Sequence, residues 1–143
     1  MTVETVKRKL KSVRNLKVRL MALEQRINEI AEEIDGVSAV DYGKEKVKSS
    51  NGNAIESRYI RQMDRLKDLQ CEYDAIFNDL CAVEDELGER MKRLNPTEYQ
   101  VVYERYMKGI RLLPLNGAAK KFGYSLDGIK TIQKRAFKKM ADF

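Results

Sequence analysis

The sequence contains no histidine and no tryptophan, and it has only two cysteines and two prolines among its 143 residues. Without histidine, the chain has no imidazole to act as a general base or to bind a transition metal. Cys71 and Cys81 are ten residues apart in one helical pattern, about 15 Å along the axis, which is too far for a disulfide. No phosphate-binding loop of the GxxxxGK type occurs. These absences argue against an enzyme and predict neither a cofactor nor a metal site.

Long apolar runs are also missing. No stretch approaches the roughly 18 consecutive apolar residues that would indicate a membrane span. The N-terminal segment contains Glu4 and seven Lys or Arg residues from Lys7 to Arg19, where a signal peptide would have its apolar region. We therefore predict a cytoplasmic protein that has no membrane partner.

Charged residues are abundant but unevenly distributed. Residues 1–35 carry 8 basic and 6 acidic side chains, residues 36–94 carry 10 and 12, and residues 95–143 carry 10 and 4. The last third therefore has a net charge of +6, which equals the net charge of the whole chain. A small basic segment attached to a nearly neutral one predicts a polyanionic partner.

Two long amphipathic helices are predicted in the first part of the chain. Apolar residues recur every three or four positions over two long segments, as in helices with one buried face. Residues 36–53 between them have no such period and are rich in glycine, serine and asparagine. The pattern predicts helices over about 3–35 and 54–93, joined by a loop over 36–53, with Gly36 ending the first helix.

The charges of these two helices indicate how they pair. The segment 7–19 is basic, whereas the segment 72–89 contains seven carboxylates and no basic residue. An antiparallel hairpin brings the two segments together, whereas a parallel pair of first helices would place like charges side by side. With the loop above as the turn, Lys17 is expected opposite Glu72. We interpret the basic residues as ion-pair partners and the carboxylates as a solvated, charge-matched face.

A strong helix start follows the second long helix. Asn95 suits the N-cap, Pro96 the first helical position, and Glu98 the third position of a capping box. We place a domain boundary here. The predicted division is a helical hairpin over 1–93 and a separate module over 94–143.

The rest of the module has the spacing of a helix-turn-helix. A short helix is predicted before Gly123, which allows the positive φ of a tight turn, and Ser125 is the predicted N-cap of a last helix that reaches about Met140. On the side of this helix opposite its apolar residues, three basic residues recur every four positions. They are Lys130, Lys134 and Lys138. The expected fold is all-α: a long antiparallel, coiled-coil-like hairpin followed by a small helix-turn-helix module.

Roughly the last fifty residues resemble region four of bacterial sigma factors. That region opens with Leu-x-Pro-x-Glu, has Arg-Tyr before a glycine, turns at Phe-Gly-x-Ser/Thr, and closes with Arg-Ala, an aromatic residue or leucine, and two lysines. The residues in register are Leu94, Pro96, Glu98, Arg105, Tyr106, Gly109, Phe122, Gly123, Ser125, Ile129, Ile132, Arg135, Ala136, Lys138, Lys139 and Met140. The resemblance implies a module that binds double-stranded DNA through its last helix.

The overall layout is similar to that of small phage and prophage proteins of the ArpU-like and RinA-like kind. These combine a long helical N-terminal part, with an Asp-Tyr-containing loop such as Asp41-Tyr42 here, and a sigma-like tail. The resemblance implies a sequence-specific regulator of phage or prophage genes. It further implies an activator of late genes that works with host RNA polymerase in the cytoplasm of a bacterial cell.

The sigma pattern also implies which residues contact DNA. Ser125 suits a backbone phosphate because it begins the last helix. The pattern implies base-edge and phosphate contacts at positions 126, 127, 128, 130 and 131, of which Asp127, Lys130 and Thr131 carry suitable side chains, and the lysine stripe adds Lys134 and Lys138. Arg135 and Lys139 are candidates for contact with polymerase or another partner. Leu126 and Gly128 depart from the pattern, because sigma factors carry long polar or basic side chains there, so base readout is expected to be narrow.

Two other interpretations remain open. Small terminase subunits of phages also combine a helix-turn-helix with oligomerising helices, and a ring-sized mass in solution would favour that function. The other interpretation is a protein-interaction module whose helix-turn-helix no longer binds DNA. The hairpin is a candidate for contacts within a homo-oligomer.

Overall fold

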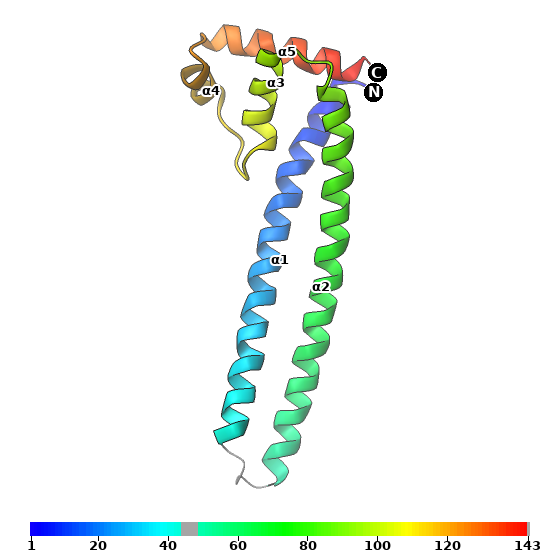
Figure 1. Ribbon diagram of the computed structural model, residues 1–143, viewed down its shortest axis with the longest axis vertical. Helices are drawn as coiled ribbons and strands as arrows, with labels where there is room; N and C mark the ends of the chain where they lie inside the picture. Colours follow the sequence, from blue (N-terminus) through cyan, green and yellow to red (C-terminus); the bar gives the residue numbers. More distant parts are fainter. Residues whose placement is uncertain (44–48, 143) are drawn as a thin grey trace. The chain divides into compact units, whose positions relative to one another are not determined.

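The computed structural model describes residues 1–43 and 49–142, and every regular element in these ranges is a helix (Figure 1). The elements in chain order are α1 (Val3–Gly43), α2 (Ser49–Met91), α3 (Pro96–Val102), the π-helical turn η1 (Tyr103–Met107), α4 (Leu115–Phe122) and α5 (Leu126–Ala141). The predicted all-α class is confirmed, with long N-terminal helices that pack together before a helix-turn-helix module.

Both long helices extend past their predicted ends. The helix α1 continues through Gly36 to Gly43, and α2 already begins at Ser49. The predicted loop is therefore wrong over 36–43 and 49–53, while residues 44–48 lie outside the described residues. A glycine in a helix interior costs only about 1 kcal/mol, and a helix that is already formed gains one backbone hydrogen bond with each added residue. A single glycine therefore does not end α1.

The contacts divide the chain into two compact units. The first unit comprises Met1–Val18 and Asn78–Phe143, and the second comprises Arg19–Phe77. The helix-turn-helix thus shares a unit with the start of α1 and the end of α2. The domain boundary between residues 93 and 94 that the sequence suggests stays a prediction.

In the second unit, α1 and α2 pack through their apolar stripes. The buried residues are Leu20, Leu23, Ile30 and Ile34 of α1 and Ile76 of α2. At the edge of this contact, Gln62 Nε2 donates a hydrogen bond of 2.8 Å to Glu33 Oε2. Burial of each large aliphatic side chain contributes about 1.5–3 kcal/mol, so the apolar stripes rather than this polar contact hold the pair together.

In the first unit, the basic and acidic segments of the two helices lie against each other, as the sequence predicts. Lys9 forms an ion pair with Glu86, and Lys17 Nζ lies 3.9 Å from Glu84 Oε1. The partner number falls as the α1 number rises, so the two helices are antiparallel. The predicted register is wrong, however, because Lys17 meets Glu84 rather than Glu72. Both helices extend into the predicted loop, so the pairing calculated from that loop does not apply.

The first unit also contains the core of the helix-turn-helix. Its central cluster is small and lies between α3, α4 and α5, with four partly buried apolar residues packed around it (Figure 1). The buried members are Val101, Ala118, Ala119 and Ile129, and the surrounding ones are Leu113, Leu115, Phe122 and Ile132. The two alanines allow α4 to approach its neighbours closely.

Polar contacts attach this module to the ends of the long helices in the same unit. Arg90 Nη1 of α2 donates a hydrogen bond of 2.7 Å to the carbonyl oxygen of Met140 at the end of α5. The Lys17 ammonium of α1 donates to the carbonyl oxygen of Met107 in η1. These bonds attach the module to the long helices at two points, η1 and the end of α5.

Candidate nucleic-acid interface

The turn between α4 and α5 has the geometry that the sequence predicts. Gly123 ends α4 with φ +73°, a left-handed conformation that favours glycine. The backbone N–H of Tyr124 donates to the carbonyl oxygen of Ala119 at 3.0 Å. Ser125 then caps α5, because its Oγ accepts a hydrogen bond of 3.0 Å from the N–H of Gly128. The predicted positive φ and the predicted N-cap are both confirmed.

The start of α3 is tied to the end of α5. Asn95 Oδ1 accepts a hydrogen bond of 2.8 Å from the N–H of Glu98, and Glu98 Oε1 accepts one of 3.3 Å from the N–H of Asn95. This is the predicted capping box. Glu98 is buried, and its Oε1 also accepts from the Lys139 ammonium of α5. The capping carboxylate therefore joins the two helices as well as starting one of them.

Arg105 is a buried cation at the centre of the module, and the sequence alone did not reveal this role. Its Nε donates to the carbonyl oxygen of Leu113 at 2.9 Å, and the N–H of Leu113 donates back to the carbonyl oxygen of Arg105 at 3.2 Å. The guanidinium also donates to Gln133 of α5 and lies over the ring of Tyr106, 5.0 Å from its centroid. Arg105 thus connects η1, the segment before α4, and α5. The only sequence signal for this role was that Arg105 belongs to the Arg-Tyr motif.

The helix α5 has two distinct faces. The buried face contacts the core through Ile129, Ala136, Phe137 and Met140. The exposed face brings together most of the residues that the sequence predicts for DNA contact. They are Asp127, Lys130, Thr131, Lys134 and Lys138. No ion-pair partner of the three lysines is found among the described residues, so their charges are available to a polyanion.

Two side chains at the start of α5 already make local hydrogen bonds. The Ser125 hydroxyl oxygen accepts from the N–H of Gly128, which leaves its own O–H hydrogen free to donate to a phosphate. The Thr131 hydroxyl donates to the carbonyl oxygen of Asp127 at 2.9 Å and retains its capacity to accept. Asp127 lies in the first turn, where a carboxylate favours the helix dipole and can accept a hydrogen bond from a cytosine amino group.

Gly128 lies in a crowded position. A Cβ placed on it would lie 3.1 Å from Ser125 Oγ and 3.6 Å from Tyr124 Cβ. The first distance is shorter than ordinary van der Waals contact, and the crowded atom is the oxygen that caps α5. A side chain at this position would therefore crowd the oxygen that caps α5.

The two candidates for partner contact differ in their surroundings. Arg135 is exposed and forms no ion pair with any described residue. The ammonium of Lys139 instead pairs with the buried carboxylate of Glu98. Lys139 therefore stabilises the packing of α3 against α5, and Arg135 presents the freer charge.

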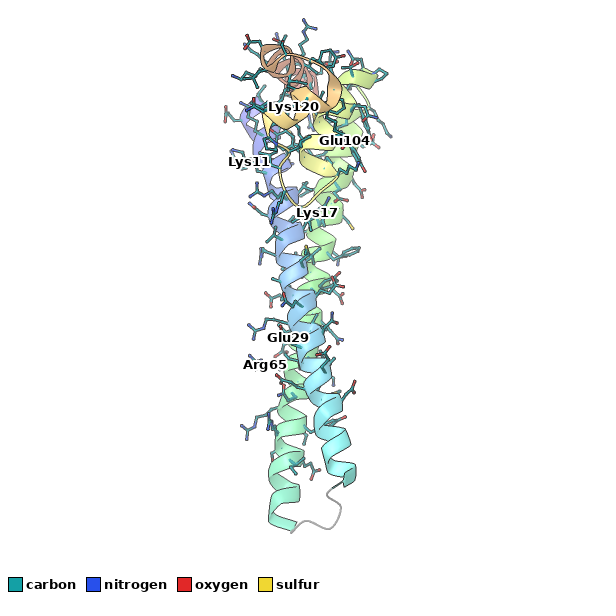
Figure 2. All side chains as sticks on the ribbon, turned by 90° about the vertical axis from the view of Figure 1, so that its left-hand side faces the viewer. Lys11, Lys17, Glu29, Arg65, Glu104 and Lys120 are labelled. Carbon is teal, nitrogen blue, oxygen red and sulfur yellow. The ribbon has the colours of Figure 1, made fainter. Side chains whose placement is uncertain are left out.

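A second ion-pair cluster stabilises the support helix α4. Lys121 Nζ lies 2.7 Å from Glu104 Oε2, and Lys108 Nζ lies 3.4 Å from Glu104 Oε1. The hydrogen bond from Lys121 is the main cause that lowers the pKa of Glu104 from its ordinary value of 4.5, and Lys108 adds to it against the opposing effect of burial. Lys120, which is also in α4, is exposed (Figure 2).

These helices form a module of known type. Residues 90–142 match the family model of Sigma-70, region 4. The match includes α3, η1, α4 and α5. No curated protein and no solved structure gives a significant match to the chain. The C-terminal part is thus a sigma-region-4-like helix-turn-helix, which supports a DNA-binding, regulatory role.

Two further features bear on the class of site. None of the described helices combines the length and the apolar character needed to cross a membrane. Within residues 1–43 and 49–142, no three His, Cys, Asp or Glu side chains are grouped so that they could hold a metal ion. The exposed face of α5, in the module that matches Sigma-70, region 4, is the candidate functional site.

Proposed function

We propose that the protein is a sequence-specific, DNA-binding regulator of phage or prophage transcription. The observation that carries this proposal is the exposed basic face of α5 in a module that matches Sigma-70, region 4. The turn, both helix caps and the buried Arg105 hold this face in a fixed orientation. A rigid helix with a basic surface is suited to entering the major groove of DNA.

Most of the binding energy should come from phosphates. Lys130, Lys134 and Lys138 are exposed and unpaired among the described residues, so each can neutralise a phosphate and release counterions. Ser125 adds a hydroxyl donor at the helix start. Direct base contacts should be fewer, and the exposed polar side chains of Asp127 and Thr131 are the candidates for them. The protein should therefore combine strong salt dependence with a short recognised sequence.

The further steps of the proposal are activation of late genes and cooperation with host RNA polymerase in the bacterial cytoplasm. They are supported by the resemblance to ArpU-like and RinA-like proteins and by the match to a region of sigma factors. Arg135, exposed and unpaired among the described residues, is the first candidate for a polymerase contact. The long helices offer a surface for self-association.

Genome-wide crosslinking of the tagged protein during phage induction tests this proposal. A peak upstream of packaging or structural genes, together with increased transcription from that promoter in a purified polymerase assay, is the expected result. A peak at the packaging site and a ring-sized mass in solution would instead support a terminase-like function. Absence of any enriched site, with weak binding to all duplexes, would contradict DNA binding altogether.

A further inference from the structure

A second basic surface lies on α1, near the helix-turn-helix. Lys7, Lys11 and Arg14 follow one another at steps of four and three, so they share one face of the helix. All three are exposed, and none forms an ion pair with a described residue. Lys9 and Lys17 differ, because they pair with carboxylates of α2. The interpretation of the N-terminal basic residues as ion-pair partners thus applies to only some of them.

This face of α1 borders two hollows of the first unit. One hollow has Val3 and Lys7 on its α1 side. On its α5 side it is lined by Lys130, Gln133, Lys134, Phe137 and Lys138. The other is lined by Leu10, Lys11, Arg14, Asn15, Arg105, Tyr106 and Leu112. No carboxylate lines either hollow. Lys7 therefore faces the same open space as the α5 lysines without local neutralisation, and Lys11 and Arg14 line the second hollow.

We propose that Lys7, Lys11 and Arg14 form a second phosphate-binding surface, which contacts the DNA backbone beside the groove that α5 enters. This inference rests on the proposed function. A helix with its side chains is about 10–12 Å across and the major groove is about 12 Å wide, so a phosphate strand runs along each flank of an inserted helix. Lys7 lies on one such flank, across the hollow from Lys130 and Lys134.

The chain offers a matched control for this surface. Arg8 of the first unit and Arg19 and Arg26 of the second are also exposed on α1. On an ideal helix their sequence positions fall about 100° from those of Lys7, Lys11 and Arg14. The test variant is Lys7→Gln/Lys11→Gln/Arg14→Gln, and the control is Arg8→Gln/Arg19→Gln/Arg26→Gln. Both remove three positive charges from the same helix. Affinity for a mixed-sequence duplex of about 30 base pairs is measured by fluorescence anisotropy from low to moderate salt.

The test variant should lose affinity and should lower the salt slope by up to about 0.9 for each lost phosphate contact, or about 2.7 for three. The control should keep a slope close to that of the unchanged protein. Equal slopes in the two variants would overturn the inference, provided that their melting temperatures agree. If the unchanged protein does not bind the duplex, the proposed function itself fails, which is a distinguishable result. If the test variant loses binding to polymerase but keeps the salt slope of DNA binding, the inference of a second phosphate-binding surface is also overturned.

Discussion

Replacement of Gly128 by alanine tests how the start of α5 is packed. In a helix interior, alanine is more favourable than glycine by up to about 1 kcal/mol, so propensity alone predicts a gain of at most that size in the free energy of unfolding for this first-turn position. The new Cβ, however, would lie 3.1 Å from Ser125 Oγ. This oxygen must move by a few tenths of an ångström, which weakens its hydrogen bond with the N–H of residue 128.

Complete loss of a serine cap costs about 1 kcal/mol, and a weakened cap costs a part of that. We therefore expect Gly128→Ala to raise the free energy of unfolding by only about 0.5 kcal/mol. In a Ser125→Gly background, the crowded oxygen is absent and glycine still serves as a cap. There, Gly128→Ala should give nearly the full gain of about 1 kcal/mol.

Urea unfolding followed by circular dichroism measures these differences in the four proteins of the cycle. Gly88→Ala is a control, because a Cβ on Gly88 of α2 meets no atom within 4 Å and should give the full propensity gain. Equal gains from Gly128→Ala with and without Ser125 would refute the crowding argument. Gly128→Arg extends the test to DNA: affinity should rise, whereas lost binding in a well-folded variant would show that the helix backbone approaches DNA closely.

Three further predictions concern the first unit. Arg105→Met should lower the free energy of unfolding by about 1–3 kcal/mol in urea titrations, because it leaves the Leu113 carbonyl without its donor; a loss below about 0.5 kcal/mol would contradict the role of the buried cation. The pKa of Glu104 is lowered from its ordinary value of 4.5, so its ionised carboxylate contributes to the free energy of unfolding above about pH 4.5. This contribution is lost as the pH falls through the folded-state pKa. Glu104→Gln should therefore lose less of its free energy of unfolding as the pH falls on the acid side, and an equal loss in the variant and the unchanged protein would exclude that effect. Cysteines at Lys9 and Glu86, in a background without the native cysteines, should be joined within one chain by a short bismaleimide; mainly interchain products in dilute solution would show that the helices pair between chains.

Local signals in the sequence predicted the local structure well. Asn95, Glu98, Gly123 and Ser125 act where the sequence places them, because caps and tight turns depend on residues only a few positions apart. The charge pattern also predicted the antiparallel pairing of α1 and α2, since the opposite charges lie in long segments.

Features that depend on tertiary contacts could not be predicted in this way. The register of α1 on α2 depends on where the turn lies, and Gly36 did not end the helix. The burial of Arg105 depends on Leu113 and Gln133, which come from two other segments. The pairing of Lys139 with Glu98 likewise joins residues that are far apart in the sequence.

The most direct test of the account is the salt dependence of DNA binding after Lys130, Lys134 and Lys138 are replaced together by alanine. A charge-matched control replaces Arg58, Arg61 and Arg65, which are exposed on α2 in the second unit. We expect weaker binding to every duplex and a slope lower by up to about 2.7 for the α5 variant, with little change for the control. An unchanged slope in a folded α5 variant would show that this helix does not contact DNA.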